Sequence, residues 1–427
     1  MPRTARLTAW LLLVVGLLPA QLAWLYLLRG SHVAGRESTL IFGQLLLGAA
    51  AIGMLVLLRT TPHDAIRLSP RASVALVAAG AALLQFAAVA LLGPSPADDR
   101  HAVLLRAALA CCAVAAVTIL AIALRRTGES PWHAALLGWN PLLTLEVGGT
   151  GHADAIGVCL LAGALAAAAD RRFKLGAVAL ALACAVKPSA ALLLPFVWWQ
   201  AHEQRSFRAG RRVVLVFAAT AALAYVAVQL YPDRSDHPGG RASVRAAGSP
   251  SGNPTHGSDG ASPSRSNAVP AEGNALVYES FQSLFGDGGA GPQTERAKDA
   301  ARLIGVLVIL AMGLFLWQSR ATPAEAAYWL FLPLLLFAPA APPCRLVWPL
   351  VALPLLRGPQ GFAALTWCAT AAICYARPPT ADAPIPPQWL IAEYLPVLCV
   401  LAVEVLRLAR LVPLNRAVQT APRPVPA

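Results

Sequence analysis

Apolar runs of membrane-crossing length repeat along almost the whole chain, and this repetition limits the fold more than any other feature. Hydrophobic residues make up 57% of the 427 residues, charged residues only 13%, and the mean hydropathy is +0.59. A transmembrane helix needs about 20 mostly apolar residues. Candidate crossings lie at 7–28, 40–58, 73–93, 107–124, 134–147, 152–169, 175–200, 213–231, 302–319, 327–354, 362–376 and 389–408. We predict an all-α polytopic membrane protein and exclude a water-soluble domain.

Two of these runs carry polar residues at their middle and predict paired segments. The run 175–200 contains Lys187-Pro188, and the run 327–354 contains Cys344-Arg345 after two prolines. Basic clusters at 171–174 and 205–212 flank the first run on both sides. Short loops rich in Lys and Arg stay cytoplasmic, so this run should cross twice or re-enter. The same interpretation of the second run predicts about 12 to 14 transmembrane segments, with both termini cytoplasmic.

The polar stretches divide the chain into four parts. We predict an N-terminal transmembrane bundle at 1–231, a non-cytoplasmic loop at 232–299, C-terminal transmembrane segments at 300–410 and a cytoplasmic tail at 411–427. The loop begins Gly/Ser/Pro-rich, which favours disorder, and 274–285 favours a short amphipathic helix. The first apolar run is longer than a typical cleaved signal peptide, which favours a retained signal-anchor.

The formal net charge of +13 follows mainly from the basic cytoplasmic loops that orient the bundle. A nucleic-acid partner would need a soluble basic domain, and the sequence offers none. The cysteines are mostly single and lie inside apolar runs, and there is no CxxC motif. They favour small core residues over a disulfide or metal framework.

Several polar residues nevertheless interrupt the apolar sequence between 140 and 189. They are Asn140, Glu146, His152, Asp154 and Lys187, interleaved with glycines and prolines. A charged side chain at the bilayer centre costs at least about 2.5–3.5 kcal/mol, so such residues indicate a functional site. Broken helices at membrane depth are tolerated where they are buried in protein or line a watery cavity. The sequence therefore predicts a polar site inside the bundle.

The predicted topology brings further charges to the same non-cytoplasmic mouth, namely Glu37, Asp98, Asp99 and Arg345. Carboxylates beside a histidine and a lysine can deprotonate a sugar hydroxyl and hold a phosphate leaving group. Structural alternatives stay open for each group. Asp98-Asp99 also fits a solvated loop, and His152 with Asp154 a helix cap. Lys187 could also snorkel toward the membrane surface or form an ion pair. For Arg345, a structural and a functional role fit equally well.

The central motifs resemble a known family. The segments 139–155 and 180–195 are similar to the central signature of bacterial GT-C glycosyltransferases, in particular the polyprenyl-phosphate-mannose-dependent mannosyltransferases. The segment 91–100 resembles the acidic outer loop of that family, 337–348 its late turn and 277–281 its aromatic outer-loop element. The resemblance spans roughly 70–405. It implies a GT-C-like bundle, a polyprenyl-phosphate sugar donor and a cell-envelope glycan or glycolipid acceptor.

The resemblance also implies roles for single residues. Asp98 or Asp99 would be the general base, with Glu37 in reserve, and Lys187 with Arg345 would hold the donor phosphate. Glu146, His152, Asp154 and Asn140 would bind donor or acceptor. No motif specifies a metal, although a divalent cation is compatible with the acids. The outer loop after Asp99 is shortened relative to the family, so a catalytically degenerate carrier, transporter or assembly partner is the alternative.

Overall fold

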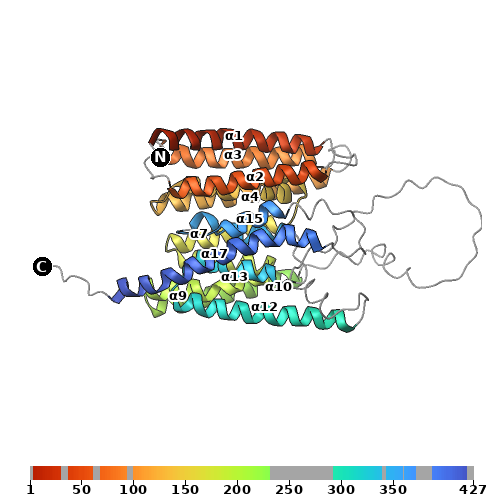
Figure 1. Cartoon of the computed structure of the whole chain (residues 1–427). Helices are drawn as coiled ribbons and strands as arrows, with labels where there is room; N and C mark the ends of the chain where they lie inside the picture. The colour runs from red at the N-terminus through yellow and green to blue at the C-terminus, as the bar shows by residue number, and fades with distance from the viewer. Residues whose placement is uncertain are drawn as a thin grey trace, which may run out of the picture.

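The computed structural model describes residues 3–29, 37–60, 68–93, 100–230, 292–338, 343–358, 360–371 and 387–420 (Figure 1). Within these ranges every regular element is a helix, which confirms the all-α prediction. The predicted loop lies outside the described residues up to position 291. Asp98 and Asp99 also lie outside them, as does the side chain of Glu37.

Long helices form most of the bundle. They are α1 (Arg3–Arg29), α2 (Glu37–Thr60), α3 (Pro70–Leu92), α4 (Arg100–Arg126), α10 (Phe207–Leu230), α12 (Pro292–Gln318) and α17 (Pro387–Thr420). Five described stretches are long and apolar enough to cross a membrane: Ile41–Thr60, Pro70–Leu92, Arg100–Arg126, Phe207–Ala227 and Asp299–Gln318. Large apolar side chains on the outer helices are exposed, with Leu223 at 71% and Leu310 at 63%. Such a surface suits lipid rather than water, so the chain is a polytopic membrane protein.

The remaining predicted crossings are shorter helices. They are α7 (Asp154–Ala169), α8 (Phe173–Val186), α9 (Leu194–Gln204), α13 (Pro323–Leu336) and α15 (Phe362–Thr370). Several are too short to span a bilayer alone. They lie among the long helices, where protein rather than lipid surrounds much of their surface (Figure 1).

The stretch predicted as one crossing at 134–147 is broken into four short pieces. These are η2 (Pro131–Ala134), α5 (Ala135–Gly138), α6 (Pro141–Leu143) and η3 (Thr144–Gly149), the last a π-helix. Proline lacks the N–H that would continue the helix, and the Asn140 side chain accepts a hydrogen bond from Leu142 N at 2.9 Å to start the next turn. The segment is almost entirely buried, so protein groups rather than lipid surround the broken backbone.

The run around Lys187 turns back on itself, as its flanking basic clusters predict. Helix α8 ends at Val186, η4 (Pro188–Leu193) follows, and α9 returns. The guanidinium of Arg205, after α9, donates a hydrogen bond to the carbonyl of Arg171, before α8, at 3.2 Å. Both ends of the run therefore lie at the same end of the bundle.

The second paired run behaves in the same way. It contains α13, then η6 (Pro343–Leu346), α14 (Val347–Leu350) and η7 (Leu353–Leu355). Arg320 before the run pairs with Glu203 at 2.9 Å, and Arg357 after it pairs with Glu129 at 3.5 Å. Both partners belong to the end of the bundle that holds Arg171 and Arg205. We call this the basic end, defined by Arg126, Arg171, Arg205, Arg320 and Arg357.

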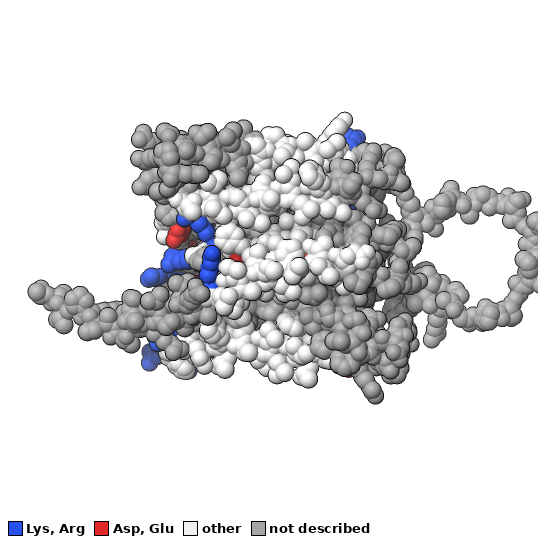
Figure 2. Space-filling model, viewed as in Figure 1, with Lys and Arg blue, Asp and Glu red and all other residues white. Residues whose placement is uncertain are grey.

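Figures 1 and 2 show the two ends of the molecule. The start of α1 and the end of α17 lie at the left in Figure 1, and the charged side chains of Figure 2 concentrate at that end. The flank between the ends carries almost no charge on the visible face. This distribution is that of a bundle whose middle contacts hydrocarbon and whose ends contact head groups and water.

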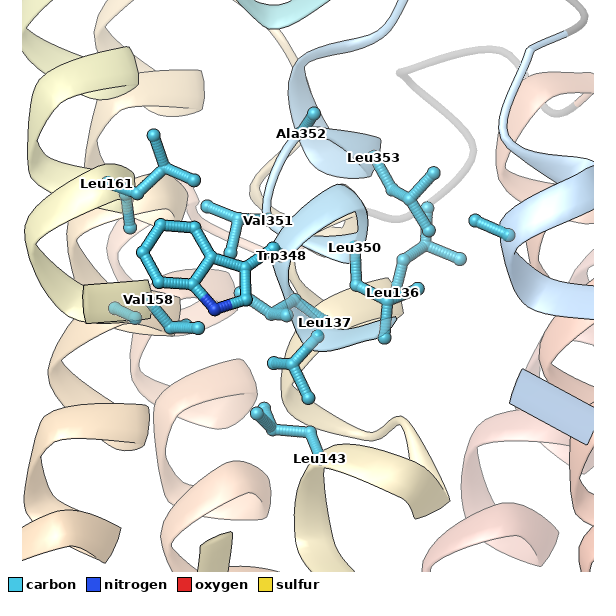
Figure 3. Close-up of a cluster of buried hydrophobic side chains, with 14 of the residues drawn as sticks. Leu136, Leu137, Leu143, Val158, Leu161, Trp348, Leu350, Val351, Ala352 and Leu353 are labelled. Carbon is cyan, nitrogen blue, oxygen red and sulfur yellow. The ribbon is translucent and has the colours of Figure 1, made fainter. Parts of the chain in front are cut away.

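Trp348 lies in the core that carries the functional segments. Its indole is 1% exposed and packs against Val158 and Leu161 of α7, with Leu137 and Leu143 of the broken segment nearby (Figure 3). The late turn is thereby held against α7, although nearly 200 residues separate them in sequence. The described cysteines are free, and of these Cys344 and Cys368 are buried whereas Cys111 and Cys399 are exposed, so the prediction of core positions holds for only some of them.

Candidate functional site

Three segments meet at the end of the bundle opposite the basic end. They are η3 with the turn that follows it, the break between α8 and η4, and η6. We call this the site end. Helix α7 has 16 residues and runs from the site end at Asp154 to the basic end at Asp170. At 1.5 Å per residue the two ends lie about 24 Å apart along it.

Glycines allow the turn after η3 to pass close to its neighbours. A Cβ atom at Gly148 would lie 2.6 Å from the carbonyl oxygen of Gln85 on α3, and Gly151 has a φ of +77°. The guanidinium of Arg106 on α4 donates hydrogen bonds to the carbonyls of Gly149 and Leu92. Arg106 thus fixes the turn to α3 and α4, a role that our sequence analysis did not assign to it.

Glu146 and His152 form the first polar pair of the site. Glu146 Oε2 lies 3.4 Å from His152 Nε2, with the carboxylate 3% exposed and the imidazole 44% exposed. The π-helical turn and the three glycines at 148, 149 and 151 reverse the chain between them, so that both side chains meet. The pair links a buried carboxylate to the surface of the site end.

Lys187 and Asp154 form the second pair. Lys187 Nζ lies 3.7 Å from Asp154 Oδ2, and both side chains are largely buried. The same ammonium lies 4.9 Å from the centre of the Trp348 ring, a cation–π contact. Lys187 has extended backbone angles between α8 and η4, and Pro188 prevents the helix from continuing through it. The helix break therefore delivers the cation to the first turn of α7.

Cys344 and Arg345 of η6 complete the site. The ligand atoms of Glu146, His152 and Cys344 all lie within 4.8 Å of one another. A carboxylate, an imidazole and a thiol are groups that Zn²⁺ and related cations accept. Lys187 lies within electrostatic range of Cys344 and Arg345. The positive charges of Lys187 and Arg345 oppose the binding of a metal ion at this position.

Five of the predicted site residues come together: Glu146, His152, Asp154, Lys187 and Arg345. Asn140 does not join them. Its side chain caps α6 and lies beside Cys368 of α15. Sequence reasoning missed Arg106, Trp348 and Cys344 as neighbours of the site. The charge of Arg106 inside an apolar helix was the one sequence signal that pointed to it.

The comparisons with known proteins bear on this same part of the chain. A family model described as "Alpha-(1->6)-mannopyranosyltransferase, N-terminal domain" matches residues 98–203, which include every predicted site residue except Glu37 and Arg345. Over this part of its length the chain is similar to mannosyltransferases. It is 28% identical over 248 residues to alpha-(1->6)-mannopyranosyltransferase A of Mycobacterium tuberculosis (strain ATCC 25618 / H37Rv).

That alignment covers 54% of this chain and 43% of the relative, so the chain spans less than half of the relative's length. No solved structure matches the chain. The family-model match covers the segment around the site, from just before α4 into α9.

Proposed function

We propose that the protein is a membrane mannosyltransferase that moves a mannosyl group from a polyprenyl-phosphate donor to a hydroxyl of a cell-envelope glycan or lipid. The observation that carries this proposal is Lys187, a largely buried ammonium delivered by a helix break to Asp154 and Trp348. It lies in the segment that matches the mannosyltransferase family. A cation in this setting suits the phosphate of a lipid-borne donor.

In the proposed reaction, the acceptor oxygen forms a bond to the anomeric carbon while the bond from that carbon to the phosphate oxygen breaks. The bonding electrons leave with the polyprenyl phosphate, whose charge Lys187 and Arg345 stabilise. The acceptor proton goes to a carboxylate, Asp98 or Asp99, with Glu37 as the alternative base. Helix α4 begins at Arg100 and holds the site through Arg106, about 9 Å further along its axis.

The other polar residues position the substrates. His152 is exposed at the mouth and can hydrogen-bond a sugar hydroxyl, while the buried Glu146 orients its imidazole. Asp154 shares Lys187 with the donor phosphate and keeps the ammonium in place when the site is empty. Asn140 contributes through the cap that directs the broken segment toward the site.

The proposal also assigns the two sides of the membrane. Basic residues gather in short loops at the basic end, and such loops remain in the cytoplasm. The site end then faces the non-cytoplasmic side of a multi-pass cell-membrane protein, and both termini are cytoplasmic. The four parts predicted from the sequence follow this arrangement, with the loop at 232–299 on the side of the site.

A transfer assay tests the proposal. The full chain is reconstituted in liposomes with labelled polyprenyl-phosphate mannose and a cell-envelope lipid acceptor fraction. We expect transfer by the unaltered protein and a loss of about 100-fold or more for Asp99→Asn, because a general base contributes about 10²–10⁴ in rate. Lys187→Met should also lose transfer, with weakened donor binding.

Lys174→Met is the matched control, because Lys174 is an exposed lysine at the basic end of the same helix, α8. It should retain full activity. Full activity of both Asp99→Asn and Lys187→Met would contradict the proposal. Donor binding by the unaltered protein without transfer to any acceptor would instead identify the degenerate alternative, which kept the donor pocket and lost the chemistry.

A further inference from the structure

A polar cavity lies at the basic end, away from the candidate site. Its volume is about 1260 Å³, and α2, α4, α7, α9, α13 and α17 contribute to its wall. Its lining includes Asp170 and Arg171, which helix α7 separates from Asp154 by about 24 Å. The cavity is therefore distinct from the site around Lys187, and the proposed reaction makes no use of it.

Five arginines line this cavity: Arg59, Arg126, Arg171, Arg357 and Arg407. The acids in the lining already have partners. Asp170 accepts a hydrogen bond from Arg126 at 2.8 Å, and Glu129 pairs with Arg357 at 3.5 Å. Glu325 accepts from the backbone N–H and the hydroxyl of Thr322 in a capping box. Positive charge therefore remains in the cavity after these pairs have formed.

Arg59 differs from the other lining arginines because its unpartnered nitrogens are buried. Its Nη1 and Nη2 atoms are inaccessible and have no hydrogen-bond partner among the described residues. The guanidinium lies 5.8 Å from the centre of the Phe362 ring, which supports one of its faces. Two buried guanidinium nitrogens without an acceptor are costly, so a ligand in the cavity that supplied one would stabilise this arrangement.

The carboxylate that acts on Arg59 electrostatically, Glu404, is committed elsewhere. Its Oε1 accepts hydrogen bonds from the backbone N–H groups of Phe362 at 2.6 Å and Ala363 at 3.3 Å. Its Oε2 accepts from the Tyr328 hydroxyl at 2.6 Å. Glu404 thus moderates the charge of Arg59 from a distance and provides none of its hydrogen bonds.

We propose that the basic-end cavity binds a phosphorylated ligand whose phosphate oxygens are held by Arg59. The planar guanidinium fork fits phosphate in a two-point contact. The volume exceeds what a bare phosphate fills, so the cavity also takes the organic part of the ligand. Gln200 Oε1, a hydrogen-bond acceptor in the lining without a partner among the described residues, suits a hydroxyl of that part. The phosphate comes from a lipid head group or from a soluble phosphate ester.

Binding to the full chain in detergent tests this proposal, with inorganic pyrophosphate as the soluble probe and calorimetry as the readout. Vesicles of phosphatidylglycerol in phosphatidylcholine, against phosphatidylcholine alone, are the lipid probe. Arg59→Met should weaken the binding of the responding probe at least tenfold. Arg208→Met, an exposed arginine on α10 at the same end but outside the cavity lining, should leave it unchanged.

A response to pyrophosphate assigns a soluble ligand, and a response to phosphatidylglycerol alone assigns a lipid head group. Lys187→Met must not reduce binding, because a loss there would place the probe at the candidate site and overturn the proposal. Binding by neither probe, or equal losses in the Arg59 and Arg208 variants, would overturn it as well.

Without ligand, Arg59→Met should keep or raise the melting temperature. A clear fall would make Arg59 a structural partner of Glu404 and also overturn the proposal.

Discussion

Lys187 has two neighbours that explain why a cation lies inside an apolar bundle. Asp154 neutralises part of its charge at 3.7 Å, and the face of Trp348 offers a further attraction at 4.9 Å. Neither contact uses all three N–H groups of the ammonium. A phosphate oxygen can therefore join the same ammonium without displacing either neighbour. At the residue scale, the Lys187 ammonium therefore keeps hydrogen-bonding capacity for an anionic ligand.

Lys187→Met tests this description through stability as well as binding. The lost ion pair is partly exposed and is worth about 0–1 kcal/mol, while methionine keeps a contact of its sulfur with the Trp348 ring. We expect the melting temperature in detergent to change by no more than about 2 °C, and the affinity for polyprenyl-phosphate mannose to fall at least tenfold. A clear drop in melting temperature with unchanged donor affinity would show that Lys187 is a structural partner of Asp154.

At the element scale, α7 sets the position of the site because it contacts both other segments. Gly157 lies one turn after Asp154, and a Cβ atom there would lie 2.6 Å from Trp348 Cζ2 and 3.1 Å from Val186 Cγ1. The absence of a side chain at Gly157 lets the late turn and the end of α8 pack against α7. The distance from Lys187 to Trp348 therefore depends on Gly157, which has no side chain and takes no part in the proposed reaction.

Gly157→Ala should destabilise the protein by about 1–3 kcal/mol, because the new methyl group overpacks the buried indole. Gly163→Ala is the matched control on the same helix. Its Cβ atom would lie 3.8 Å from its nearest neighbour, Ala179 Cβ, an ordinary contact. Alanine also has a higher helix propensity than glycine, so this change should be neutral or stabilising. Thermal unfolding of both variants in detergent measures the difference, and equal melting temperatures would contradict the packing role of Gly157.

At the scale of the whole molecule, ion pairs join segments that are distant in sequence at the basic end. Arg126 pairs with Asp170, Glu203 with Arg320, and Glu129 with Arg357. These pairs bring the starts and ends of both paired runs to one side. The two proposals concern opposite ends of the bundle. The candidate site lies at one end and the arginine-lined cavity at the other.

Cysteine labelling measures which end faces outward. In a variant whose own cysteines are replaced, Ala153→Cys presents a thiol at the site end and Gln204→Cys one at the basic end, both at exposed positions. A membrane-impermeant reagent added to intact cells should label position 153 and should reach position 204 only after lysis. Labelling of position 204 in intact cells would reverse the proposed sidedness.

The sequence alone determined the membrane fold, the two paired runs and the polar residues of the central segment. The reason is energetic: apolar runs require lipid or a dry core, and charges inside them require partners. The basic clusters beside the Lys187 run predicted its return, which the hydrogen bond from Arg205 to Arg171 confirms. The grouping of Glu146, His152, Asp154, Lys187 and Arg345 also followed from topology.

Only the tertiary structure decided how these groups pair and what surrounds them. The grouping of Cys344 with Glu146 and His152, the Trp348 ring beside Lys187 and the cavity around Arg59 all join segments far apart in the chain. Hydropathy specifies how deep a residue lies, but the rotation and register of each helix depend on close packing at positions such as Gly157. Partners across the bundle are therefore set by side-chain fit, which no local pattern records.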